Sequence, residues 1–175
     1  MADILQEKWL RGVAVTTTIL AVMTAIVSAR SNTCTANTQL LTSEEAMKWQ
    51  YYQSTSVKIQ FIDVQRGILQ TQTLVGLDEA QKKIIADRFK VFDEDTAKFT
   101  KKKDDLEAKA KALGKEKKVV GKQGFEYMLA VVFFQIAIML SSVSALLHRK
   151  SLWITGLLFG VVAMVYFANG FFLFF

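Results

Sequence analysis

The side chains that most often carry catalysis or bind metals are scarce in this sequence. His148 is the only histidine and Cys34 the only cysteine among 175 residues. A single cysteine excludes an internal disulfide and a multi-cysteine metal site, and a single histidine excludes a His-pair metal site. A catalytic carboxylate needs a pocket that shifts its pKa, and the sequence indicates none. We therefore expect a protein that is not an enzyme, with no cofactor and no catalytic, cofactor-binding or metal-binding residues.

Two polar side chains lie within long apolar stretches. Gln135 and Asn169 would sit inside a membrane, where polar groups are costly and often functional. Counted along two helices from the turn at Arg149, they are ~21 Å and ~30 Å deep, so they need not meet. Hydrogen bonds between helices are one interpretation, and a polar pore or ligand site is the other.

An aromatic segment and a lysine-rich segment remain as candidates for binding. Trp49, Tyr51, Tyr52 and Gln53 with Lys58 form a candidate recognition surface, unless the rings pack against lysine stems of a neighbouring helix. Residues 101–122 are rich in lysine, which suits either a solvated helix face or lipid headgroups. Acidic residues are interleaved and no aromatic residues alternate with the lysines, so we expect no nucleic-acid partner.

Three uncharged runs must organise these residues. Residues 12–29, 127–147 and 151–175 are each long and apolar enough for a transmembrane helix. Val27-Ser28-Ala29 would also fit a signal-peptide cleavage site, but we expect a retained helix. The absence of proline suits long unbroken helices.

The basic residues beside these runs predict the orientation. The turn 148–150 is short and fully basic, so it should be cytoplasmic, and Lys8 and Arg11 place the N-terminus on the same side. The block 31–124 then lies outside. Its lysines before residue 125 disagree with that placement, but long loops translocate largely regardless of charge.

The polar block 31–124 predicts an antiparallel coiled-coil hairpin. After a linker at 31–42, a capping box of Thr42 and Glu45 begins a helix over about 43–75. A turn at Gly76-Leu77, with Asp78 as the cap, leads to a second helix over about 79–122. In the first helix, residues spaced alternately by 3 and 4 form a stripe: Met47, Gln50, Ser54, Val57, Phe61, Val64, Ile68, Thr71 and Val75.

The second helix repeats apolar residues every seven positions, from Ile85 to Val120. A two-helix hairpin buries little surface by itself, so we expect such stripes to close a core shared by several chains. Gly156 and Gly160 form a small-xxx-small motif that allows close helix contact. The predicted oligomer interface comprises Val57, Phe61, Val64, Ile68, Ile85, Phe92, Phe99, Leu106, Leu113, Gly156 and Gly160.

The chain resembles a bacterial membrane-protein family, the domain of unknown function 4337. The resemblance rests on three segments: Trp49, Tyr51, Tyr52 and Gln53 with Ser56 and Lys58; residues 133–137 with Ser141-Ser142; and residues 167–172. It covers nearly the whole chain and implies no activity, because the family has none assigned. It makes the segment 49–58, Gln135 and Asn169 the leading candidates for functional residues.

Together these features predict an all-α integral membrane protein of the bacterial inner membrane. An N-terminal transmembrane helix (1–30) is followed by the extramembrane hairpin (31–124) and a transmembrane hairpin (125–175). We expect a non-enzymatic scaffold that self-assembles into a homo-oligomer among membrane lipids. The alternatives are an accessory subunit of a larger membrane complex and a channel or transporter component.

Overall fold

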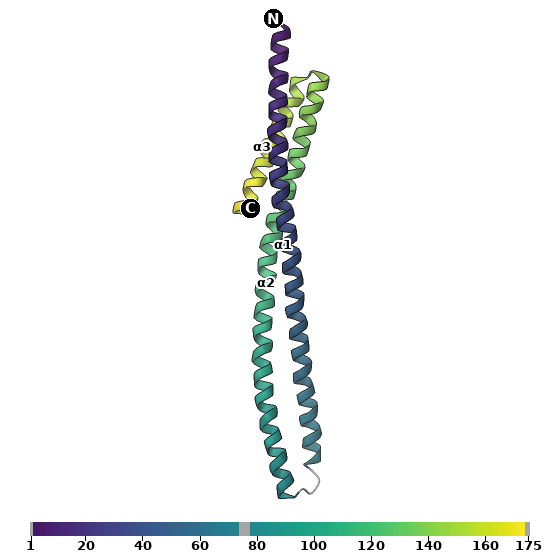
Figure 1. Cartoon of the computed structure of the whole chain (residues 1–175), viewed down its shortest axis with the longest axis vertical. Helices are drawn as coiled ribbons and strands as arrows, with labels where there is room; N and C mark the ends of the chain where they lie inside the picture. The colour runs from purple at the N-terminus through teal and green to yellow at the C-terminus, as the bar shows by residue number, and fades with distance from the viewer. Residues whose placement is uncertain (1, 74–77, 174–175) are drawn as a thin grey trace. The chain divides into compact units, whose positions relative to one another are not determined.

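The chain is all-α in the part that the structure describes. The structure is a computed structural model that describes residues 2–73 and 78–173, with side chains from Trp9 onward. It consists of helices α1 (Ala2–Gln72), α2 (Glu79–Leu147) and α3 (Lys150–Phe172) (Figure 1). Two of these long helices, α1 and α2, pack against each other. Val75, Gly76 and Leu77, which were assigned to the stripe and the turn, lie outside the described residues.

Helix α1 is continuous across the predicted linker, so the linker at 31–42 and the helix start at Thr42 are wrong. No glycine or proline occurs between Gly12 and Gly67 to break the helix. The hydroxyl groups that suggested a linker bond to their own helix instead. Thr35 Oγ1 donates to the Ser31 carbonyl at 3.0 Å, and Thr38 Oγ1 donates to the Cys34 carbonyl at 2.8 Å.

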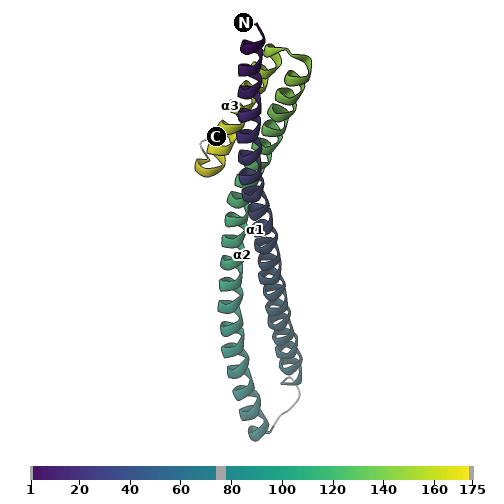
Figure 2. The same cartoon turned by 45° about the horizontal axis from the view of Figure 1, so that its top comes forward.

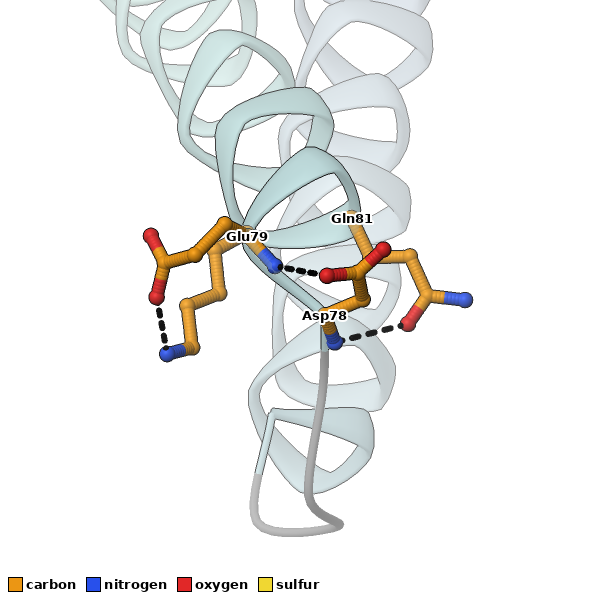
Figure 3. Close-up of polar contacts among 4 residues, drawn as sticks. Asp78, Glu79 and Gln81 are labelled. Atoms are coloured by element: carbon orange, nitrogen blue, oxygen red, sulfur yellow. Dashed lines mark hydrogen bonds and ion pairs between the residues drawn. The ribbon is translucent and has the colours of Figure 1, made fainter.

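The start of α2 is held by a reciprocal cap, as Asp78 predicts. A carboxylate oxygen of Asp78 accepts a hydrogen bond from the Glu79 backbone N–H at 2.8 Å, and Gln81 Oε1 accepts from the Asp78 N–H at 3.2 Å (Figure 3). Lys82 Nζ donates to Glu79 Oε1 at 2.7 Å. The two bonds to the Asp78 and Glu79 N–H groups satisfy backbone donors that have no partner within the helix.

The residues group into two compact units, with boundaries near residues 39 and 117. The three-helix unit contains the described parts of residues 1–39 and 117–175, and the hairpin unit contains residues 40–116 without the four that are not described. The core of the three-helix unit brings together residues of all three helices: Leu20, Val27, Tyr127, Ala130, Phe134, Ala137 and Ala163.

Each of the three helices contains a stretch long and apolar enough to cross a membrane. The basic turn between α2 and α3 lies where the sequence predicts it. Arg149 N–H donates to the Ser144 carbonyl at 3.2 Å, and Ser144 Oγ donates to the Arg149 carbonyl at 2.8 Å. His148 takes a left-handed backbone conformation with φ 52°. This conformation and the two bonds between Ser144 and Arg149 form the short connection between α2 and α3.

In the hairpin unit, α1 and α2 run antiparallel and side by side (Figure 2). The α1 residues that face α2 are spaced alternately by 3 and 4 and include polar side chains. Thr55 and Ile62 are buried, and Tyr52, Ile59 and Leu69 are half-buried. Across from them, Phe92, Leu106 and Ala110 of α2 are buried. The contact between the helices is therefore narrow, with few large apolar residues.

Candidate functional site

The side of α1 that faces away from α2 carries an uncovered apolar stripe. Val57, Phe61, Val64 and Ile68, here called the outer stripe, are between 54% and 61% exposed. At about 100° per residue, they lie opposite the direction of Thr55 and Ile62. The predicted stripe on α1 is therefore not the face that packs against α2.

The surface around the outer stripe carries few charges. Between Gln50 and Thr71 the side chains on this half of α1 are neutral except Lys58, which lies at its edge, one helical turn before Phe61. Core residues of protein interfaces are depleted in charged groups because charges are costly to desolvate. The exposed neutral residues that surround the outer stripe are Gln50, Gln53, Ser54, Gln60, Gly67 and Thr71.

The α2 residues of the predicted oligomer interface are less exposed than the outer stripe. Phe92 and Leu106 are buried, and Ile85, Phe99 and Leu113 are half-buried. They follow the heptad that faces α1 within the hairpin unit. Their apolar side chains thus pack against their own chain, whereas the outer stripe of α1 does not.

The aromatic segment is divided between these two environments. Trp49 and Tyr52 contact each other edge to face, with ring centres 5.4 Å apart. Lys103 Nζ of α2 lies 5.3 Å from the centre of the Tyr52 ring, and Lys58 Nζ lies 5.8 Å from the centre of the Phe99 ring. These cation–π contacts join the two helices.

Within the same segment, the side chains of Tyr51 and Gln53 are exposed. Of the five residues of the candidate recognition surface, Trp49, Tyr52 and Lys58 thus contribute to packing within the hairpin unit. Only Tyr51 and Gln53 present their side chains outward without such a contact.

Ion pairs add polar contacts in the hairpin unit. Arg66 of α1 pairs with Asp93 of α2. On α2, Lys111 Nζ donates to Glu107 Oε1 at 2.5 Å. This bond holds the pKa of Glu107 below its ordinary value of 4.5 and the pKa of Lys111 above its ordinary value of 10.5. Both side chains are exposed to solvent screening, so we assign this pair little stability.

Gly156 and Gly160 pack against helices of their own chain. A Cβ at Gly156 would lie 3.0 Å from the Ala137 carbonyl oxygen, and one at Gly160 would lie 3.2 Å from Leu20 Cδ2. The close helix contact at these glycines is therefore made by α2 and α1 of the same chain, and their predicted part in an oligomer interface stays a prediction. Both glycines are buried in the three-helix unit.

The two polar residues of the apolar stretches have different surroundings. Asn169 is 1% exposed, whereas Gln135 is exposed. Asn169 also supports the end of α3, where its carbonyl accepts a hydrogen bond from the Leu173 N–H at 2.7 Å. The structure does not place both side chains in one buried polar site.

Several contacts of the three-helix unit are not apparent from the sequence. Trp153 Nε1 donates to Thr16 Oγ1 at 3.1 Å, and the Trp153 ring centre lies 6.5 Å from that of Trp9. Arg30 lies over the ring of Phe171, 5.7 Å from its centre. In the sequence, only the aromatic residues near the ends of the apolar runs point to these contacts. They do not indicate which residues of different helices pair.

The side chains of the described residues include no group of three or more His, Cys, Asp or Glu that could hold a metal ion. The described residues also present the exposed outer stripe and grooves between helices.

The chain belongs to a family described as a domain of unknown function (DUF4337), whose model matches residues 9–173. The family predicted from residues 49–58, 133–142 and 167–172 is thereby confirmed. No curated protein and no solved structure matches the chain.

Proposed function

We propose that this protein is a non-enzymatic membrane scaffold that self-assembles into a homo-oligomer. The observation that carries the proposal is the outer stripe of Val57, Phe61, Val64 and Ile68, which is apolar, exposed and bordered mostly by neutral side chains. A second copy of the chain presents the same stripe, so two stripes can cover each other about a twofold axis.

The proposed membrane placement uses the apolar stretches of α1, α2 and α3 as three transmembrane helices. The supporting observation is that each helix has a long apolar stretch. In that placement the turn 148–150 and the N-terminus face the cytoplasm. The hairpin unit, as an extramembrane coiled coil, lies on the outer side of a bacterial inner membrane.

Self-association explains why α1 carries two stripes of alternating 3 and 4 spacing. One stripe, through Thr55 and Ile62, contacts α2 within the chain. The other is left exposed, although burial of large apolar side chains stabilises association. A helix with two such stripes can pack between two neighbours, and the proposed second neighbour is α1 of another copy.

The test is the mass of the full chain in mild detergent, measured by light scattering during size-exclusion chromatography. We expect a defined multiple of the 19.7 kDa chain. Phe61→Asp should lower that mass, because each interface would bury an unpaired carboxylate. Val91→Asp is the matched control, since Val91 is an exposed apolar residue on α2.

A wild-type particle of one chain, or an unchanged mass for Phe61→Asp, would overturn the homo-oligomer. A particle that contains a second protein in fixed ratio would instead indicate an accessory subunit, which could use the same stripe. Circular dichroism of each variant shows whether the helices persist, so that loss of assembly is distinguished from unfolding.

Orientation has its own test. Thr71 is exposed near the end of α1, and Thr71→Cys in a Cys34→Ser background provides a single thiol there. A membrane-impermeant maleimide should label it in intact cells if the hairpin unit lies outside. Labelling only after lysis would reverse the proposed topology.

A further inference from the structure

A groove between α1 and α2 lies at one end of the apolar stretches of the three-helix unit. It has a volume of about 300 Å³. From α1 it is lined by Ser31, Thr35, Thr38 and Gln39, and from α2 by Gly121, Gly124, Phe125 and Met128. We propose that this groove binds the headgroup of an anionic phospholipid. The inference rests on the proposed membrane placement and identifies the class of membrane lipid that binds the groove.

The α1 wall of the groove is polar, and the α2 wall consists of glycines and apolar side chains. Along α2, Phe125 and Met128 lie next to Tyr127, where the uncharged run begins, and both side chains are largely exposed. Along α1, residues 31–39 follow the uncharged run that ends at residue 29. In the membrane placement, the end of the groove with Gln39 and Gly121 therefore lies in the headgroup layer. Ser31, Phe125 and Met128 lie at the boundary with the acyl chains.

The groove offers hydrogen-bond donors that suit a phosphate. The hydroxyl protons of Thr35 and Thr38 are donated to carbonyl oxygens of α1. On the α1 wall, this leaves the Ser31 hydroxyl and the Gln39 amide to donate to a ligand. The backbone can be approached closely at Gly121, where an added Cβ would meet nothing within 4 Å.

Lysines beside the groove supply positive charge. Lys118 precedes Gly121 by three positions and Lys122 precedes Phe125 by three, so each lies one helical turn from a lining residue. Both are exposed. Side chains of a helix tilt toward its N-terminus, which for α2 is the direction away from the apolar run. Their ammonium groups can therefore stay at the level of the headgroups.

Acidic residues do not offset this charge on the groove side. Residues 31–43 of α1 and 117–125 of α2 contain no carboxylate. Glu126 is buried, and Glu116 is about 140° around α2 from Gly121. The local excess of lysine favours a phospholipid with net negative charge over a zwitterionic one.

The experiment is native mass spectrometry of the full chain in mild detergent, with added phosphatidylglycerol or phosphatidylcholine. We expect preferential retention of phosphatidylglycerol. Lys118→Gln/Lys122→Gln should weaken that retention by about tenfold to thirtyfold, while Lys82→Gln/Lys90→Gln, the same charge change farther along α2, should leave it unchanged. Equal retention of both lipids, or equal loss in both double variants, would overturn the proposal.

A second variant tests the groove itself. Gly121→Leu fills the groove and should also abolish the preference, whereas Ala108→Leu, at an exposed position of α2 outside the groove, should not. Retention that depends on the lysines but survives Gly121→Leu would show diffuse attraction instead of a groove site. Displacement of the lipid by inorganic phosphate at matched ionic strength would indicate a free-anion site and overturn the lipid assignment.

Flotation with liposomes separates this inference from the proposed function. A wild-type chain that floats without preferring phosphatidylglycerol refutes the lipid site and leaves the membrane placement intact. A wild-type chain that does not float refutes both. Variants that float like the wild type are inserted normally, so their loss of lipid reports on the groove alone.

Discussion

A methyl group added at Gly170 should loosen the packing of α3 on α2. Gly170 is buried, and a Cβ built there lies 2.7 Å from Cδ1 and 2.9 Å from Cζ of Tyr127. The Tyr127 ring also contacts Phe167 and Phe171, with ring centres 6.0 Å and 5.7 Å away, and those two rings contact each other at 5.2 Å. A displacement of the Tyr127 ring therefore changes its contacts with this aromatic cluster.

The size of the effect follows from two opposing contributions. Overpacking of a well-packed site costs about 1–3 kcal/mol. Alanine in a helix is favoured over glycine by up to about 1 kcal/mol, and less near a helix end. We therefore expect Gly170→Ala to lower the free energy of unfolding of the three-helix unit by about 1–2 kcal/mol. Gly121→Ala, with no atom within 4 Å of the new Cβ, should instead raise it by about 0.5–1 kcal/mol.

Tryptophan fluorescence can measure both changes during denaturation by SDS. Trp153 of α3 contacts Trp9 and Thr16 of α1, so its emission reports whether α3 is docked. Trp49→Phe removes the signal of the hairpin unit. In a Tyr127→Leu background, Gly170→Ala should cost less, because the obstructing ring is gone. Equal stability of Gly170→Ala and Gly121→Ala would refute the reasoning.

Three further predictions follow from other contacts. Phe134 is fully buried in the core of the three-helix unit, so Phe134→Ala should cost about 3–5 kcal/mol in the same denaturation assay. Asp78→Ala removes the cap of α2 and should cost about 1 kcal/mol, seen as faster hydrogen exchange in the first turn of α2. Because Lys111 lowers the pKa of Glu107, their pair contributes above pH 4.5 and its contribution is lost as pH falls through the lowered folded-state value. Thermal melts of wild type and Glu107→Gln should therefore differ slightly at neutral pH and converge in acid.

The sequence was sufficient to predict an all-α chain with three long helices, because apolar length and periodicity are local properties. Three long uncharged runs predict three long helices. The predicted end of the second helix near residue 122 is wrong, because α2 continues through Gly121 and Gly124 to Leu147 without a proline to break it. Asp78 indicates the start of α2 because capping depends only on neighbouring backbone groups. The aromatic and C-terminal segments sufficed for the family.

The linker at 31–42 could not be judged correctly from composition. Threonine, serine and asparagine favour turns when their side chains bond to the backbone, but within a helix the same hydroxyls can donate to carbonyl oxygens of the preceding turn. Thr35 and Thr38 do the latter. The sequence also did not indicate which face of α1 contacts α2. The apolar stripe is the more conspicuous repeat, but the more polar stripe is the one that contacts α2.

The sequence by itself determined that this chain is helical, that three of its stretches can cross a membrane, and where the turn 148–150 and the cap at Asp78 fall. These features depend on residues close together in the chain. Only the tertiary structure decided that Thr55 and Ile62 face α2 while Val57 and Phe61 remain exposed, and that Gly170 receives the ring of Tyr127. Those choices depend on which surfaces fit across helices far apart in sequence, and a repeat of 3 and 4 alone does not specify its partner.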